Sequence, residues 1–278
     1  MSLMFVHRYT LVPRRALSPI GRTRPREGAL IRVGDGFADV HPWPELGDAP
    51  LDEQLARLTR GETTPLTARS LLCAEIDGAA RVAGRSLFDG LTIPPSHWPG
   101  DDPPRGFDTV KLKSADRLPD DVRLRIDFNS RLRPEEFVFI AESLPRERVD
   151  FIEDPCPYDG GTWSALRDTT GLRLALDRVV AEEGVDVLVV KPAIAEVPRD
   201  GREIVITSYM DHPIGQFFAA YVAATHHVGT CGLFTHVLYE PNAFIDAIRA
   251  VGARLQPPLG TGIGFDRLLE ALPWTRLA

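Results

Sequence analysis

The chain has 278 residues, of which 44% are hydrophobic and 26% charged, which is ordinary for a folded protein with one or two cores. Its net charge is −7 and it has no basic block, so we expect no nucleic-acid partner, because phosphate neutralisation needs clustered Lys and Arg. We also expect a cytoplasmic protein without a membrane partner, since no segment reads as a signal peptide or transmembrane helix and three distant cysteines suggest no disulfide framework.

Residues 1–85 predict an α+β capping domain. Two short apolar runs, 29–33 and 37–40, flank a Gly-Asp-Gly turn and are typical of a β-hairpin. Leucine spacing predicts a helix over 51–60, and a second helical pattern covers 66–83.

A Pro-rich loop between the hairpin and the first helix contains His41 and Trp43. If the capping domain covers an active site, both side chains are placed to touch a substrate. The alternative, at least as well supported, is that the loop is rigid and its Trp packs against the rest of the protein.

From residue 86 to 278 the pattern changes to short apolar strands separated by helices. The expected strands are 109–113, 123–127, 150–153, 174–177, 187–191 and 204–208, and the expected helices are 134–144, 163–169 and 213–226. Strands that alternate with helices indicate parallel βαβ units, and so many units indicate a barrel or a doubly wound sheet. Several connections are too short for a helix, so a barrel would be a shortened one.

Five consecutive predicted strands end in an ionisable residue. In chain order these are Lys113, Asp127, Glu153, Asp177 and Lys191. In a (β/α) barrel the active site lies at the carboxyl ends of the strands, so we expect the three carboxylates to converge. They would repel one another unless a cation joined them, and oxygen ligands without His or Cys favour Mg²⁺, with Mn²⁺ possible.

Lysine is rare in this chain, and every lysine belongs to this pattern. Of the 32 basic residues only Lys111, Lys113 and Lys191 are lysine. Unlike arginine, lysine can give up its proton when its pKa is lowered. Lys111 and Lys113 lie on the same face of their strand, so each ammonium lowers the other's pKa and makes a competent base. Singly, each of these residues is better explained as a turn or a surface charge; jointly they predict proton abstraction next to a carboxylate.

A family resemblance rests on these residues. The chain contains Lys111-Leu112-Lys113, Asp127-Phe128-Asn129, Glu153-Asp154-Pro155, Leu176-Asp177 and Lys191-Pro192. Over about residues 109–215 it resembles the enolase superfamily in its muconate lactonising enzyme-like subgroup, and within that subgroup most of all a divergent, shortened branch of the o-succinylbenzoate synthase family. The resemblance implies an α/β fold: a shortened, enolase-type (β/α)7β-like TIM barrel with an N-terminal α+β capping domain.

The resemblance also implies residue roles in a carbon–oxygen lyase of menaquinone biosynthesis. Asp127, Glu153 and Asp177 would bind Mg²⁺. Lys113 would remove the proton α to the carboxylate of a small-molecule substrate and then protonate the departing hydroxyl, Lys191 would stabilise the enediolate, and Lys111 would support Lys113. Asn129, Arg125 and Ser208 would contact substrate.

Other functions remain open at this point. Asp211 and His212 stand where many relatives carry a Ser- and Glu-containing run, and this region helps to set substrate choice, so an N-acylamino acid racemase or dipeptide epimerase on the same scaffold is the first alternative. A catalytically inactive binding module would have lost a ligand or a lysine, and none is lost. A nucleotide-dependent doubly wound enzyme is disfavoured because no Gly-rich turn follows the first barrel strand.

Overall fold

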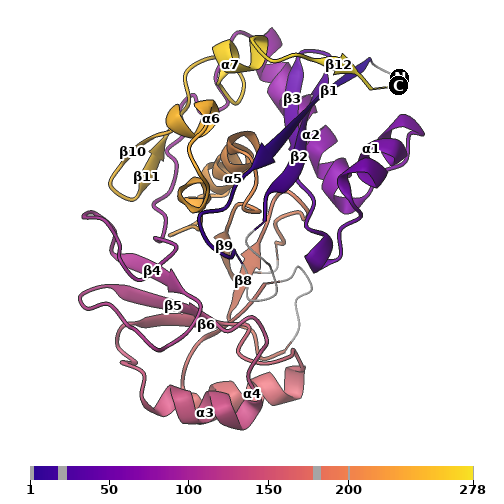
Figure 1. Cartoon of the computed structure of the whole chain (residues 1–278). Helices are drawn as coiled ribbons and strands as arrows, with labels where there is room; N and C mark the ends of the chain where they lie inside the picture. Colours follow the sequence, from indigo (N-terminus) through magenta and orange to yellow (C-terminus); the bar gives the residue numbers. More distant parts are fainter. Residues whose placement is uncertain (1–2, 18–23, 178–182, 200, 278) are drawn as a thin grey trace.

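A computed structural model describes residues 3–17, 24–177, 183–199 and 201–277 (Figure 1). An antiparallel sheet with its helices forms one part, and a parallel sheet with outer helices forms the other. The long hydrophobic helix α5 (Pro213–Thr225) lies between the two.

The antiparallel sheet has four strands in the order β12-β1-β2-β3. They are β1 (Met4–Leu11), β2 (Arg26–Val33), β3 (Gly36–Val40) and β12 (Thr275–Arg276). The predicted hairpin is therefore confirmed, with β2 longer than expected, whereas β1 and β12 were not foreseen. The expected boundary after residue 85 would build this sheet from the capping domain alone. The structure adds the C-terminal strand β12, which pairs with β1.

Two helices cover this sheet, α1 (Leu51–Thr59) and α2 (Pro65–Val82), and both lie within one or two residues of the predicted ranges. The Thr64 hydroxyl accepts a hydrogen bond from the backbone N–H of Thr67, and the Thr67 side chain in turn accepts one from the backbone N–H of Thr64, so α2 starts with a reciprocal cap. Pro65 at the first helical turn has no N–H to lose, which fixes the start of α2 at this position.

The parallel sheet has six strands in sequence order, β4 to β9. Their bounds are β4 (Thr109–Leu112), β5 (Arg123–Asp127), β6 (Val149–Glu153), β7 (Leu174–Leu176), β8 (Val187–Val190) and β9 (Glu203–Ile206). All six predicted strands are confirmed, most of them one or two residues shorter at the carboxyl end.

Isolated parallel bridges continue this sheet round to its first strand. Thr207 at the end of β9 bridges Gly232, the neighbouring Cys231 bridges Ser96, and Trp98 bridges Val110 of β4. The sheet thus curves into the expected barrel, with its last and first members reduced to single bridges.

Helices α3 (Pro134–Glu142) and α4 (Gly160–Thr170) cover the outside of the barrel, where they pack on each other. Successive side chains of a strand point to opposite faces of the sheet. Phe151, Val189 and Val205 therefore form a small separate cluster inside the barrel, while their neighbours in the strands face the helices. The connections elsewhere are short elements: η1 (Pro44–Leu46), η2 (Thr235–Leu238), α6 (Ala243–Asp246), β10 (Arg249–Val251), β11 (Arg254–Gln256) and α7 (Asp266–Glu270).

The loop with His41 and Trp43 is a packed part of the core. The indole of Trp43 is 1% exposed, and its Nε1 donates a 2.8 Å hydrogen bond to the carbonyl of Tyr209 after β9. His41 is also 1% exposed and lies beside Tyr9 of β1. The packing alternative is therefore the correct one, and neither side chain lines the large cavity described below.

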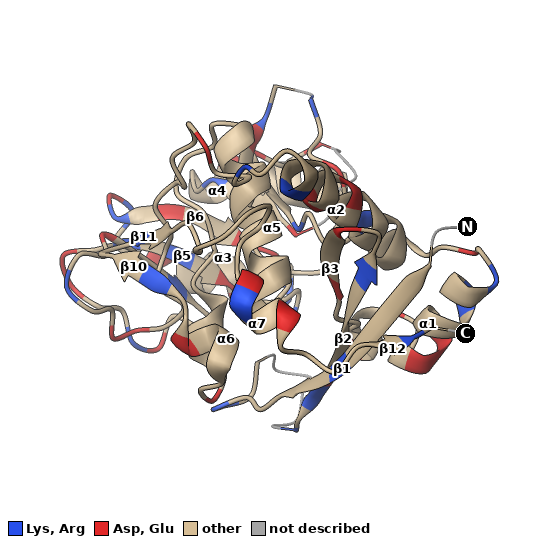
Figure 2. Cartoon of the chain, turned by 90° about the horizontal axis from the view of Figure 1, so that it is seen from above, with Lys and Arg blue, Asp and Glu red and all other residues tan. Residues whose placement is uncertain are grey.

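Acidic and basic residues are interspersed over the side of the molecule that Figure 2 shows, so this side has no large patch of a single charge. Among the described residues no helix is both long and apolar enough to cross a membrane.

Candidate active site

A cavity of about 460 Å³ opens where the barrel strands end. Its walls include side chains at the ends of all six strands β4 to β9: Lys111, Lys113, Asp127, Asn129, Asp154, Asp177, Lys191, Thr207 and Ser208. Leu17, Leu46 and Met210 add apolar surface. The three lysines of the chain therefore meet at one site, which is the convergence that the sequence predicted.

Lys111 lies between two of the predicted metal ligands. Its ammonium is 2.6 Å from a carboxylate oxygen of Glu153 and 3.0 Å from Oδ2 of Asp127. Both carboxylates are almost completely buried, and Glu153 does not itself line the cavity because it lies behind Lys111. A buried carboxylate needs such a partner, since an uncompensated charge in a protein interior is very costly.

The other two lysines occupy opposite ends of the acidic series. Lys113 follows β4 and donates a 2.6 Å hydrogen bond to Oδ2 of Asp127, with about half of its side chain exposed to the cavity. Lys191 follows β8 and pairs with Asp177. Three strands separate β4 from β8, so the two ammonium groups approach the cavity from different sides.

Burial and the close approach of these charges shift the pKa values of the cluster. Burial and the neighbouring Asp127 raise the pKa of Glu153 to about 8. Burial opposes ionisation of Asp127 as well, but Lys111 and Lys113 hold the pKa of Asp127 well below its usual range. Burial lowers the pKa of Lys111, yet Asp127 and Glu153 outweigh it and leave that pKa above the ordinary value.

The donor set fits a hard divalent cation in its chemistry. Asp127, Glu153 and Asp177 supply carboxylate oxygens, which are the ligands that Mg²⁺ and Mn²⁺ prefer. As the side chains lie, no three His, Cys, Asp or Glu groups in the described ranges are close enough together to hold an ion. Lys111 pairs with Asp127 and Glu153, and Lys191 pairs with Asp177. Rotation of these flexible lysines would open the carboxylate oxygens to a metal.

Two of the three predicted substrate contacts line the cavity. Asn129 has a positive φ of 52° and its backbone N–H donates to Oδ1 of Asp127, so it follows β5 into the cavity wall. The Ser208 hydroxyl lies 2.5 Å from Oγ1 of Thr235, and both residues line the cavity. Their role as substrate contacts stays a prediction.

The structure places Arg125 away from the cavity, one layer deeper in the barrel. Its Nε donates to Asp150 at 2.8 Å, and one Nη donates to the carbonyl of Thr230 at 2.9 Å. The guanidinium also stacks over Phe151. Because residues 125 and 127 share a strand face, sequence periodicity alone could not tell the layer at the cavity from the layer below it. Direct contact between Arg125 and substrate is thus not supported.

Asp211 and His212 also lie outside the cavity wall. Both are 3% exposed, and the His212 ring accepts a hydrogen bond from the backbone N–H of Ile214 at the start of α5. The neighbouring Met210 is the residue of this segment that lines the cavity.

The sequence reasoning missed several cavity residues, among them Asp154, His97 and Thr207. Asp154 follows Glu153 with a positive φ of 44°, and burial together with Asp177 raises its pKa to about 6. His97 and Thr207 come from the two places where single bridges close the barrel. Asp154 could have been predicted, because it directly follows the predicted ligand Glu153. His97 could not, because its segment lacks the apolar pattern of a barrel strand.

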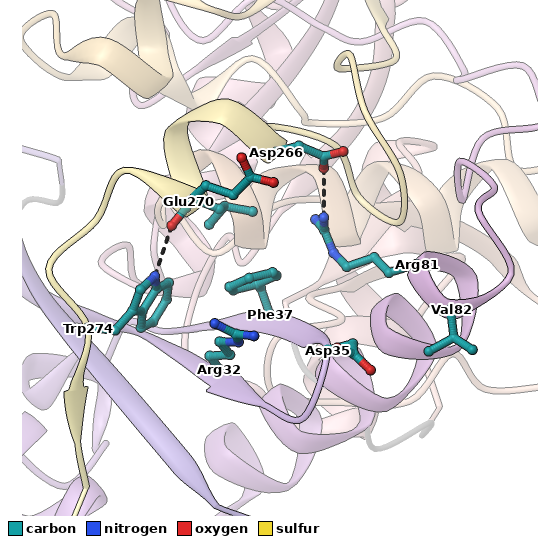
Figure 3. A pocket seen from close by; sticks show the side chains of 9 residues that line it. Arg32, Asp35, Phe37, Arg81, Val82, Asp266, Glu270 and Trp274 are labelled. Carbon is teal, nitrogen blue, oxygen red and sulfur yellow. Dashed lines mark hydrogen bonds and ion pairs between the residues drawn. The ribbon is translucent and has the colours of Figure 1, made fainter.

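A second cavity, of about 440 Å³, lies far from these residues between β3, α2 and α7 (Figure 3). Its central cation, Arg81, is committed to Asp77 and to Asp266 at 2.7 and 2.6 Å, and the indole of Trp274 donates to the carbonyl of Leu269. In Figure 3 the Arg81–Asp266 pair thus joins α2 to α7, and the Trp274 bond lies within the C-terminal segment, so these polar groups hold the fold together.

Comparison with known proteins agrees with this geometry. Residues 4–80 match the family model described as the N-terminal domain of O-succinylbenzoate synthase. An o-succinylbenzoate synthase from Bdellovibrio bacteriovorus is 34% identical over 97% of each chain. Among solved structures, an enolase superfamily member from Listeria innocua has a TM-score of 0.78, with 14% identity over 100% of this chain and 99% of its own.

A dipeptide epimerase from Enterococcus faecalis, solved with Mg and the dipeptide L-Leu-L-Tyr, has a TM-score of 0.73 at 16% identity over 95% of this chain and 99% of its own. Such distant structural likeness supports the enolase-type fold alone. The sequence match over 97% of each chain is decisive for the family: this chain belongs to the o-succinylbenzoate synthase family.

Proposed function

We propose that this protein is a Mg²⁺-dependent hydro-lyase that converts a succinyl-substituted hydroxycyclohexadiene carboxylate to o-succinylbenzoate in menaquinone biosynthesis. The observation that carries the proposal is that all three lysines line one cavity and form ion pairs with Asp127, Glu153 and Asp177. Family membership supplies the substrate class.

The lysines divide the proton chemistry between them. Lys113 Nζ, exposed to the cavity, takes the proton from the carbon α to the carboxylate and returns it to the departing hydroxyl on the same face, so that the elimination is syn. Lys191 approaches from the other side and stabilises the negative charge of the enediolate as an ammonium. Lys111 stays charged between Asp127 and Glu153 and keeps a cation near Lys113.

Asp127, Glu153 and Asp177 would hold the divalent cation. When bound, it supplies positive charge that attracts the substrate carboxylate and stabilises the charge that develops on it.

An epimerase or racemase is the second candidate, because Lys113 and Lys191 flank the cavity as a two-base mechanism requires, and a solved neighbour is a dipeptide epimerase. The roles of the lysines separate the two functions. In the dehydratase only Lys113 must lose its proton, whereas in an epimerase both lysines must.

The test compares Lys113→Arg and Lys191→Arg, each of which keeps the positive charge but cannot act as a base. With Mg²⁺ and the diene precursor, loss of diene absorbance reports dehydration. We expect Lys113→Arg to lose about 10²–10⁴-fold in kcat, Lys191→Arg to retain much more activity, and chelator to stop turnover. The exposed Arg85→Ala, which removes a basic side chain far from the cavity, is the control.

Equal and complete loss in both lysine variants would contradict the dehydratase assignment of Lys191. Deuterium exchange at the α carbon of N-acylamino acids or dipeptides, without dehydration of the precursor, would assign the protein to the epimerase function.

We also propose a cytoplasmic location. Cys73, Cys156 and Cys231 are all free and buried, as expected for thiols kept in a reducing compartment.

A further inference from the structure

The arc of the barrel opposite the acidic residues is polar, and the proposed reaction leaves it unused. Asp127, Glu153 and Asp177 end β5 and β6 and follow β7, and the two lysines flank them. Going on round the barrel, β9 is followed by the bridge at Gly232 and then by the segment from Ser96 to Trp98. This arc contributes His97, Thr207, Ser208 and Gly232 to the cavity.

The ring of His97 is held in one tautomer by Arg125. Nη1 of Arg125 lies 3.1 Å from Nδ1 of His97, and a guanidinium can only donate. Nδ1 must therefore accept, so the ring hydrogen is on Nε2. Burial and then the nearby cations Arg125, Lys111 and Lys113 lower the pKa of His97 well below its ordinary value, outweighing Asp127, which keeps the ring neutral.

The Nε2–H of His97 has no partner within the described part of the chain, and the ring lines the cavity. Gly232 keeps this group accessible: a Cβ there would lie 2.9 Å from Nε2 and 2.6 Å from Cγ2 of Thr207. The hydroxyl of Thr207 is likewise buried without a partner. An oxygen of a ligand in the cavity would give the Nε2–H of His97 an acceptor.

We propose that the Nε2–H of His97 donates a hydrogen bond to the terminal carboxylate of the substrate's succinyl arm, and that Arg125 is the positioning residue that fixes and polarises this donor. The inference rests on the proposed function, because that function supplies a substrate whose succinyl arm ends in a second carboxylate. It also gives Arg125 an indirect role in place of the direct substrate contact expected from the sequence.

The test measures binding of two ligands to the full-length protein with Mg²⁺: o-succinylbenzoate, and ortho-butyrylbenzoate, whose arm lacks the terminal carboxylate. We expect His97→Leu to weaken o-succinylbenzoate binding about 10- to 100-fold and to leave ortho-butyrylbenzoate binding nearly unchanged. His97→Gln, which keeps a terminal N–H donor, should recover part of the loss. The control is His226→Leu, at an exposed helix end.

Equal weakening of both ligands by His97→Leu, or no weakening of either, would overturn the proposal. Nitrogen-15 NMR of the imidazoles gives a second measurement. If His97 had a structural role only, its nitrogen-15 chemical shift would not change when ligand binds. We expect the Nε2–H form of His97 in the free protein and a shift of that resonance with o-succinylbenzoate but not with ortho-butyrylbenzoate. An imidazolium or an Nδ1–H form of His97 in the free protein would contradict the assignment of Nε2–H as the donor.

Turnover separates this inference from the proposed function. If the wild type dehydrates the precursor and His97→Leu leaves both KM and binding unchanged, His97 has no such role and the function stands. If the wild type binds o-succinylbenzoate through His97 but does not convert the precursor, the donor stands and the function fails. Wild-type protein that binds neither ligand overturns both.

Discussion

At the scale of single residues, the site depends on how three carboxylates are neutralised. Lys111 is the main counter-charge, since it touches both Asp127 and Glu153, and its side chain is only 15% exposed. Removing it leaves two buried carboxylates that repel each other; burial and then Asp127 already raise the pKa of Glu153.

Lys111→Met should therefore lower stability in the absence of metal by about 3–5 kcal/mol, because one partner of a buried ion pair is lost. The same change removes a competitor for the carboxylates, so Mg²⁺ should raise the melting temperature of the variant more than that of the wild type. Thermal unfolding at increasing Mg²⁺ concentration measures both effects. An identical Mg²⁺ response in variant and wild type would show that Lys111 and the cation do not share a site.

At the scale of elements, the sequence located helices and strands well where a cap or an apolar run marked them. Both α2 and α5 start at a proline, at a position that the sequence pattern places within a residue. The strands β1 and β12 were missed for different reasons. β1 has polar and charged residues between its apolar ones, and β12 has two residues, which is too short for any pattern.

The cap of α2 gives a prediction at this scale. Thr64→Ala removes the hydroxyl that accepts from Thr67 N–H and donates to Gln54, so we expect a loss of about 1 kcal/mol in the free energy of unfolding. Turnover should be unchanged, because Thr64 lies on the capping domain outside the cavity wall. Denaturant unfolding measures the change, with Asp159→Ala at the N-cap of α4 as the matched barrel variant. A loss of turnover without a loss of stability would contradict this structural role.

At the scale of the whole molecule, a buried acidic pair joins the capping domain to the barrel. Asp39 of β3 accepts a 2.6 Å hydrogen bond from the Tyr9 hydroxyl and a 3.0 Å bond from the backbone N–H of His212. Asp211 lies beside it, with one buried oxygen that has no partner. Burial raises the pKa of Asp39 to about 7, and burial and Asp39 raise the pKa of Asp211 well above its usual range.

The raised pKa values of Asp39 and Asp211 make the free energy of unfolding depend on pH. Between about pH 4 and pH 7 the folded protein holds a proton on Asp39 that the unfolded chain releases, so this pair's contribution to stability is lost as pH rises through that window. Asp211→Asn removes one of the two charges and should reduce the difference in melting temperature between about pH 5 and pH 8, at about 2–4 °C per kcal/mol recovered. A variant with the same pH profile as the wild type would show that the pair does not titrate on unfolding.

The pattern of the sequence by itself determined the α/β class, the strands β4 to β9 and the group of charged residues at their ends, whereas the family resemblance was needed to choose the barrel over a doubly wound sheet. It did so because a parallel barrel strand is a short apolar run whose last residues face the active site, and such a pattern is local. The rarity of lysine made the group visible, since every lysine of the chain stood in it.

Only the tertiary structure decided which residues meet across the barrel. It placed Arg125 below the cavity and His97 at its wall, although Arg125 lies on a clear strand and His97 on none. It also brought β12 to β1 and Asp211 to Asp39, at sequence separations that no local pattern encodes. These contacts follow from the closure of the barrel and from the packing of α5 between the two parts, because both depend on the whole chain being folded.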